Sequence, residues 1–165
     1  MAYPTAAGQG LYDASTTRVH KLGAVHSFTN SDGTITLARY VKNDSGSNIA
    51  AGQVVLYAGA EGEIGGVSAI GSPPAAVAGG AAVAMATNGY GWVIFRGKQT
   101  NASCASTTSS SADRYLWYGG TAAALQVAAA TYATDAAYAA SVCALLKAGT
   151  APAASATNTV YWTWR

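Results

Sequence analysis

The sequence carries little charge, since only 10% of its 165 residues are Asp, Glu, Lys or Arg. About 25% is usual for a soluble domain. Nine basic residues against seven acidic ones give a net charge of +2, which argues against an electrostatic nucleic-acid binder. A protein that diffuses alone usually carries more surface charge, so this composition suits a protein packed into an assembly.

Long apolar runs and export signals are also missing. The longest apolar stretch, residues 75–86, is interrupted by two glycines and is too short for a membrane-spanning helix of about 20 residues. The first residues have no basic start followed by an apolar run, so we expect no secretory signal. These features predict a protein made in a cytoplasm, with no membrane partner.

Bulky aliphatic side chains are scarce. Of 83 hydrophobic residues 38 are alanine, which leaves only 27 Val, Ile, Leu and Phe to build a core. A sheet lined by alanine needs a few large rings to fill its interior. This favours a core position for Trp92 and Trp117, whereas Trp162 and Trp164 suit a core and an exposed binding face equally well.

Groups that catalyse reactions are few. The sequence has no Gly-x-Ser-x-Gly elbow, no phosphate-binding loop and no dinucleotide fingerprint. Its one close acid pair, Glu61 and Glu63, lies in a glycine-rich turn, where neither carboxyl is shielded enough to stay protonated for glycoside hydrolysis. We therefore expect no catalytic residue, no cofactor and no enzymatic activity, with a hydrolase built on this pair as the weakest alternative.

Two histidines and two cysteines are the only potential soft metal ligands. In one extended strand His20 and His26 would share a face about 20 Å apart, and only a bend at Gly23 would let them share a zinc ion. We predict no metal site. Cys104 and Cys143 could pair only if the fold brings their Cα atoms within about 7 Å, and we favour two free thiols. Neither has a neighbouring histidine or Cys-x-x-Cys partner that would make it reactive.

Short β-prone runs separated by turn residues fill most of the chain. The predicted strands cover residues 19–28, 34–42, 49–57, 64–70, 77–86, 89–97, 114–118 and 158–164. Asp32-Gly33 is a strong hairpin signal, and residues 101–112 are typical of a loop or an edge strand. The exception is the alanine-rich segment 121–147, whose three-, four- and seven-residue spacing predicts a helix in its second half, from Thr134 or Asp135 to Lys147. Its first half, residues 123–128, is ambiguous because Leu125 and Val127 also fit the alternation of a strand.

These patterns predict two parts. Residues 1–18 lack a sustained period and form an extended N-terminal arm, whose apolar anchors are Tyr3, Leu11 and Tyr12. The arm is either an ordinary frayed terminus or a segment that orders on a neighbouring subunit. Residues 19–165 form a single, mainly β domain: a small antiparallel β-barrel or sandwich with one Ala-rich helix.

Three segments carry a family resemblance: KNDSGSNIAAGQVVLY at 42–57, IGGVSA at 64–69 and NGYGWVIFRG at 88–97. Their order of polar turns and strands resembles the small head decoration, or cement, proteins of tailed bacteriophages over residues 34–98. The resemblance implies a non-enzymatic virion protein, often a trimer, that binds the capsid exterior at junctions between major capsid subunits. It supplies no catalytic residues.

We expect the major capsid protein as partner, and a homo-oligomer, with a trimer favoured. Tyrosine, tryptophan and arginine are enriched in binding hot spots, so the aromatic residues of the arm and of the last strand are the candidate intersubunit contacts. They are Tyr3, Leu11, Tyr12, Tyr161, Trp162 and Trp164. The alternative is a carbohydrate- or host-surface-binding knob of a phage fibre, which would expose two tryptophans as a stacking platform.

Overall fold

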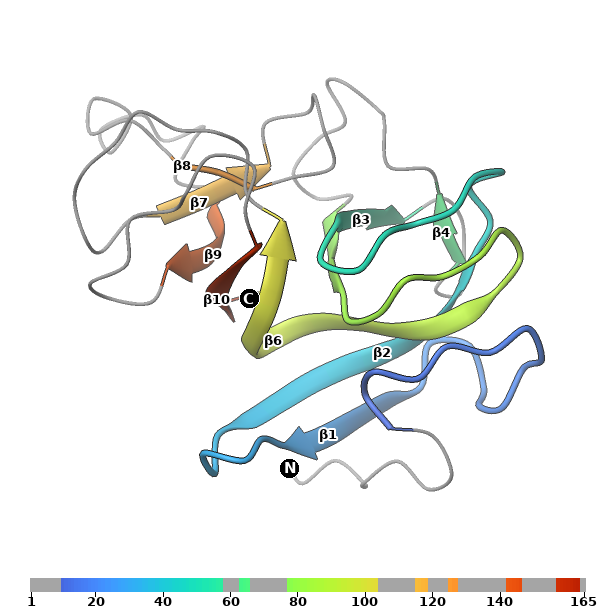
Figure 1. Cartoon of the computed structure of the whole chain (residues 1–165), viewed down its shortest axis with the longest axis horizontal. Coiled ribbons are helices and arrows are strands. Elements are labelled where there is room, and N and C mark those ends of the chain that lie inside the picture. Colours follow the sequence, from blue (N-terminus) through green and yellow to red (C-terminus); the bar gives the residue numbers. More distant parts are fainter. Residues whose placement is uncertain are drawn as a thin grey trace.

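A computed structural model shows that the chain is mainly β (Figure 1). The structure describes residues 10–57, 63–65, 77–103, 115–118, 125–127, 142–146 and 157–163. Side chains are described for residues 10–57, 77–103 and 159–163. The predicted β class is confirmed within these residues.

In the described residues, ten strands form one hydrogen-bonded sheet. They are β1 (Val25–Thr29), β2 (Ile35–Asn43), β3 (Val54–Tyr57), β4 (Glu63–Gly65), β5 (Val77–Ala81), β6 (Tyr90–Ser103), β7 (Tyr115–Tyr118), β8 (Leu125–Val127), β9 (Val142–Leu146) and β10 (Thr157–Thr163). Their order in the sheet is β1-β2-β4-β3-β5-β6-β10-β9-β7-β8, and β6 also pairs with β2. All pairs are antiparallel except β2 with β4.

Within the described residues, the sheet as a whole does not close into a barrel. Its pairings run from β2 through β4, β3 and β5 to β6 and back to β2, but β1 lies outside this circuit at one end. Strands β10, β9, β7 and β8 continue away from it at the other end (Figure 1). The finer prediction of a barrel or sandwich therefore reduces to a mainly antiparallel sheet.

The predicted helix is not present in the part of the chain that the structure describes. Within the span where we expected it, residues 142–146 form strand β9, and the rest lies outside the described residues. Strand β9 pairs with β10 on one side and β7 on the other. The helix predicted from this spacing was wrong for residues 142–146, because pairing with two aromatic strands outweighs the modest helix preference of the sequence VCALL.

The hairpin predicted at Asp32-Gly33 is confirmed. Strand β1 pairs with β2 in register from Val25 opposite Arg39 to Thr29 opposite Ile35. Gly33 has a φ of +78° at the turn, a conformation that glycine adopts without steric cost. The strand before this turn is shorter than expected, since it begins at Val25 and not at residue 19.

The glycine-flanked aromatic run that predicts the strand at 89–97 lies in β6, the longest strand of the sheet, which continues to Ser103. Gly97 interrupts it with a φ of +93°. A Cβ atom there would lie 2.4 Å from the carbonyl oxygen of Ile35, so only glycine lets β6 pass this close to β2. Beyond Gly97, β6 pairs with β10.

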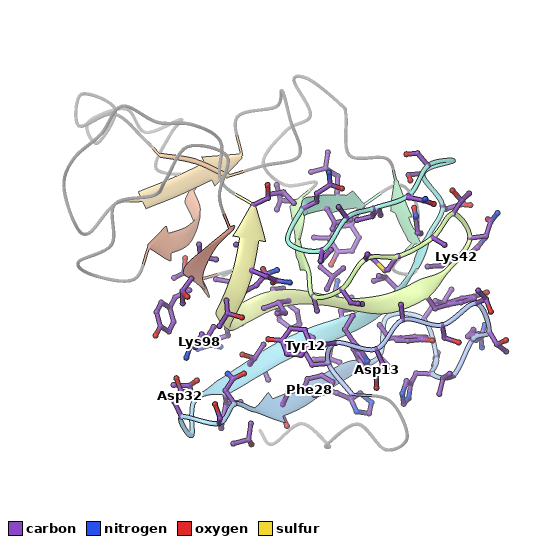
Figure 2. All side chains as sticks on the ribbon, in the orientation of Figure 1. Tyr12, Asp13, Phe28, Asp32, Lys42 and Lys98 are labelled. Carbon is purple, nitrogen blue, oxygen red and sulfur yellow. The ribbon has the colours of Figure 1, made fainter. Side chains whose placement is uncertain are left out.

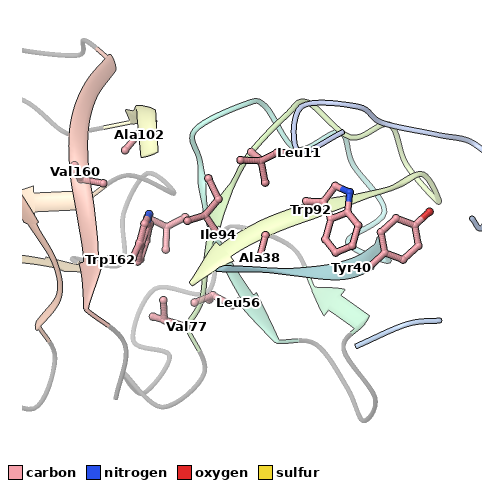
Figure 3. Packing of buried hydrophobic residues seen from close by; sticks show 12 residues of the cluster. Leu11, Ala38, Tyr40, Leu56, Val77, Trp92, Ile94, Ala102, Val160 and Trp162 are labelled. Atoms are coloured by element: carbon pink, nitrogen blue, oxygen red, sulfur yellow. The ribbon is translucent and has the colours of Figure 1, made fainter. Parts of the chain in front are cut away.

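Alternation along the strands divides the core into two clusters, one on each face. Trp92 and Ile94 belong to the larger cluster and Val93 to the smaller one, as expected for a strand covered on both faces. Figure 3 shows Trp162 beside Ile94 in one part of the larger cluster and Trp92 beside Tyr40 in another. Large rings fill this alanine-rich interior.

The described part of the predicted arm lies against the sheet. Leu11 is only 6% exposed and belongs to the larger cluster. Ser15 exchanges two backbone hydrogen bonds with Tyr90, at 3.0 and 2.7 Å. Residues 10–18 thus pack on their own chain, while residues 1–9 of the arm lie outside the described residues.

Candidate interaction surface

The candidate contact residues separate into buried and accessible ones. Leu11 and Trp162 are 6% and 2% exposed, so both serve this chain's own core and have little surface left for a neighbour. Tyr12 is 48% exposed and Tyr161 is half-buried. Tyr3 and Trp164 lie outside the described residues.

The two accessible tyrosines lie near the same lysine, although they come from opposite ends of the chain. Tyr161 of β10 stands opposite Lys98 of β6 in the strand register. A hydrogen bond to Asp32 is the main cause that raises the pKa of Lys98, and Tyr161 and Tyr12 add smaller electrostatic contributions in the same direction. Both phenols therefore lie within electrostatic range of the Lys98 ammonium group.

Asp32, at the tip of the β1–β2 hairpin, fixes this lysine through an ion pair with its Nζ atom. The carboxylate also accepts hydrogen bonds from the Thr34 backbone N–H at 3.1 Å and the Thr34 hydroxyl at 2.6 Å. The hydrogen bond from Lys98, followed by those from Thr34, holds the pKa of Asp32 well below its usual range. The Asp32 carboxylate therefore stays charged and bound to Lys98 and Thr34.

The backbone around Lys98 is equally well held. The Thr36 hydroxyl donates to the Lys98 carbonyl oxygen at 2.9 Å, and the Asn30 amide donates to the Thr36 hydroxyl at 2.9 Å. Tyr12, Asp32, Lys98 and Tyr161 together are called the Lys98 surface below. Figure 2 shows Asp32 and Lys98 near the start of β2 and the bend of β6, with Tyr12 toward the middle of the sheet.

Sequence reasoning found two members of this surface and missed the other two. It singled out Tyr12 and Tyr161 as aromatic contacts, but used Asp32 only as a turn former and assigned Lys98 no role. The available signal was weak: Lys98 directly follows Gly97, the last residue of the predicted strand 89–97. The β6–β10 register that brings Lys98 to Tyr161 joins residues 63 positions apart, which local patterns do not specify.

The side chains of the Lys98 surface are suited to contact with another protein. Aromatic rings beside a paired lysine and aspartate offer apolar area together with directional polar groups, as at protein interfaces. Among the residues that the structure describes, no group of three His, Cys, Asp or Glu side chains is placed to hold a metal ion. Glu61 lies outside the described residues, and only the backbone of Glu63 is described, in β4.

The two histidines are closer together than we predicted. Their ring centroids are 5.3 Å apart, because a turn with Gly23 at a φ of +78° separates His20 from β1. The distance of about 20 Å assumed one extended strand, which the chain does not form. The bend at Gly23 that the sequence left open is present. Of the cysteines, Cys143 lies in β9 and Cys104 lies outside the described residues.

Neither of the two tryptophan pairs considered for a sugar-binding platform has both members exposed. Trp92 is fully buried and Trp162 is 2% exposed, so each pair considered for this role loses one member to the core. The side chains of Trp117 and Trp164 lie outside the described set. Burial of Trp92 confirms its expected core position and decides the open question for Trp162.

Comparisons with known proteins found no relative of this chain. No family model, no curated protein and no solved structure matches this chain. Within the described part of the chain, no helix is long and apolar enough to cross a membrane.

Proposed function

We propose that this chain is a structural virion protein that binds the outside of a phage capsid and stabilises it by bridging major capsid subunits. The Lys98 surface supports this proposal most directly. It combines the Lys98–Asp32 ion pair with Tyr161, which stands opposite Lys98, and with Tyr12, which is 48% exposed and lies within electrostatic range of Lys98. Tyrosines have few rotatable bonds, so they bury large contact area at low entropic cost.

The fixed geometry of this surface fits a docking role. Lys98 is anchored by Asp32, and its carbonyl oxygen by Thr36. A partner that binds such a surface does not have to order it first, and preorganisation of this kind increases affinity. In the proposal these residues make contacts only, and the protein has no enzymatic activity.

The low charge of the sequence supports the proposal that copies of this protein are packed together on a shell. A chain with 10% charged residues has little electrostatic repulsion between copies, so it tolerates dense packing on a shell. We propose a homo-oligomer, most simply a trimer, on the capsid exterior. Several weak contacts to adjacent capsid subunits then add up through multivalency. Burial of apolar area at about 25 cal/mol per Å² stabilises the shell.

The carbohydrate-binding knob is the less favoured function. Such a site stacks sugar rings on exposed aromatic faces, and Trp92 and Trp162 are buried. Titration with glycans while tryptophan fluorescence is recorded separates the two functions. The capsid proposal predicts no quenching, and saturable quenching would favour the knob.

Cosedimentation with capsids tests the proposal. The purified chain is mixed with undecorated capsids assembled from the major capsid protein of the same genome, and its own mass is measured by light scattering. A small closed oligomer that saturates the capsids at a fixed ratio to capsid subunits is the expected result. A monomer that stays in the supernatant at every concentration would contradict the proposal.

A further inference from the structure

His20 and His26 lie in the contact between residues 10–24, called the N-terminal segment below, and the sheet. The Gly23 backbone N–H donates to the Tyr40 carbonyl oxygen at 2.8 Å, and the Ala24 N–H closes a turn on Lys21 at 3.0 Å. This turn places His20 over β2 and β6, next to His26 of β1. The imidazole centroids are 5.3 Å apart.

The two imidazoles pack into a group of aromatic rings. The Trp92 ring lies 5.1 Å from each imidazole, and the Tyr40 ring lies 5.1 Å from His20. On β1, Phe28 also packs against Trp92, with centroids 5.1 Å apart. The rings that surround the histidines are therefore mostly apolar.

Three ring nitrogens in this group are buried and have no hydrogen-bond partner. They are Nε2 of His20, Nδ1 of His26 and Nε1 of Trp92. A neutral imidazole needs only one donor satisfied, whereas a protonated one carries an N–H on both nitrogens. A buried charged group without an acceptor is costly, so the packing suits the neutral form of both histidines.

The two rings that contact the imidazoles, those of Tyr40 and Trp92, carry no carboxylate. Tyr40 faces His20 from β2, and its hydroxyl accepts the Val19 N–H at 3.1 Å. Lys42, further along β2, pairs with Asp44 at 3.4 Å. From β6 the facing residue is Trp92, with Tyr90 stacked on Tyr40 at 6.1 Å.

The remaining charges on the elements packed here are mostly positive. Arg18 and Lys21 flank His20 in the N-terminal segment, and Arg96 is exposed further along β6. The carboxylate of Asp13 accepts the Gly10 N–H at 2.7 Å. Burial lowers the pKa of His20, and the nearby His26 lowers it further.

We propose that the His20–His26 contact is a pH-sensitive switch that holds the N-terminal segment on the sheet at neutral pH and releases it when His20 is protonated. Acid adds a positive charge to the His20 ring, 5.3 Å from the His26 ring, and a buried N–H group at Nε2 that has no acceptor. The released contacts are those of Leu11 in the core, Ser15 with Tyr90, and Val19 with Tyr40.

The direction of the pH dependence follows from the lowered pKa of His20. Above the ordinary histidine pKa of about 6.5, the His20 side chain is neutral whether the segment is held or released, and the contact is at full strength. As the pH falls below that value the released segment binds protons first. The contact therefore weakens until the pH falls below the pKa of the held state, where the weakening stops.

The sequence makes this switch unusually easy to test. The whole chain contains two histidines, and histidine is the only side chain whose ordinary pKa lies between pH 5 and 8. A change in segment protection between pH 7.0 and 5.5 is therefore assigned to this pair. Tyr12 belongs to the same segment, so under the proposed function release also removes one tyrosine from the Lys98 surface. The test below uses no capsid and is independent of that function.

Hydrogen exchange of the full chain at pH 7.0 and 5.5, in EDTA and corrected for intrinsic exchange rates, tests the switch. We expect protection of residues 10–24 to fall several-fold at pH 5.5, up to the limit of about eightfold that one histidine of ordinary pKa allows, while β2 and β6 keep theirs. The double variant His20→Phe/His26→Phe keeps two aromatic rings in place and removes both imidazoles, so its protection is expected to be the same at both pH values. His20→Gln/His26→Gln is the second variant if the first fails to fold.

Two results would overturn the switch. One is equal protection of the segment in the unmodified chain at both pH values. The other is a fall in protection that persists in a folded double variant, since it would then have another cause.

Discussion

The indole Nε1–H of Trp162 donates a 2.6 Å hydrogen bond to Oε1 of Gln99, and both side chains are buried. The Gln99 amide nitrogen in turn donates to the Ala81 carbonyl oxygen at 2.9 Å and to Asn101 Oδ1 at 3.0 Å. One glutamine thus connects β10, β6 and the end of β5. This network explains why a tryptophan near the end of the chain is in the core.

Removal of the indole donor tests this network. Trp162→Phe leaves Gln99 Oε1 buried without a partner, which destabilises the fold by about 1–3 kcal/mol in addition to the smaller ring. The double variant Trp162→Phe/Gln99→Met removes both polar groups and is expected to lose less than the sum of its single variants. Urea unfolding measures all four proteins, and strict additivity would show that the bond contributes nothing.

Substitutions at two glycines with positive φ allow the cost of backbone strain to be measured separately from the cost of a steric clash. A Cβ at Gly79 (φ +139°) would lie 2.1 Å from the Ile94 carbonyl oxygen, whereas one at Gly46 (φ +74°) meets nothing within 4 Å. Gly46→Ala should lower the free energy of unfolding by about 1–2 kcal/mol, because alanine is strained in the left-handed backbone conformation of this position. Gly79→Ala adds overpacking of about 1–3 kcal/mol against a backbone atom. Equal midpoints in thermal unfolding would contradict the close approach of β5 and β6.

The buried Asn43 holds two loops together. Its amide donates to the carbonyl oxygens of Ser47, Met85 and Ala86 at 2.7, 3.2 and 3.1 Å. Asn43→Asp places a carboxylate against these three carbonyl oxygens. It should lower the free energy of unfolding by about 3 kcal/mol at pH 7. Burial raises the pKa of the introduced group, so the loss should shrink as the pH falls and the carboxyl regains a donor.

Asn48→Asp is the matched control for this variant. Asn48 is exposed and uses only its Oδ1 atom, which accepts the Thr87 N–H at 3.0 Å. A carboxylate accepts the same bond, so stability should stay nearly constant. Urea unfolding at pH 7 and pH 4.5 compares the two variants, and an equal loss in both would refute the role given to the Asn43 amide.

Asp32→Asn tests how the Lys98 surface is held. Asparagine keeps Oδ1 for Thr34 and replaces the Oδ2 that Lys98 contacts. The hydrogen bond to Asp32 is the main cause that raises the pKa of Lys98, so the pKa should fall toward its ordinary value in an NMR titration. The unfolding midpoint should change little because the pair is exposed. An unchanged lysine titration would show that Asp32 does not hold Lys98.

Local signals in the sequence predicted the strands well. Asp32-Gly33 specified a hairpin because the turn needs a residue that accepts positive φ, and Gly33 has that conformation. Runs of β-branched and aromatic residues located β2, β6 and β10 to within a few residues at most ends. β9 was missed, because alanine and leucine satisfy helical spacing and only its pairing with β7 and β10 decides the outcome.

The candidate site depended on contacts between distant residues. Tyr161 stands opposite Lys98 through the β6–β10 register, and Tyr12 comes within electrostatic range of Lys98 through the packing of the N-terminal segment. The proximity of His20 and His26 required one turn at Gly23, which sequence analysis named as a possible bend. Alternation placed Trp162 on one face of its strand, but which face is buried depends on Gln99 across the sheet.

Capsid binding by surface variants tests the central claim most directly. Tyr12→Ser/Tyr161→Ser changes the Lys98 surface, and Val19→Ser removes an equally exposed apolar side chain (51%) at the Tyr40 end of the sheet. If the Lys98 surface docks on capsid subunits, the double variant should bind undecorated capsids at least tenfold more weakly than the unmodified chain, with Val19→Ser unchanged. Equal binding by all three proteins would contradict the claim.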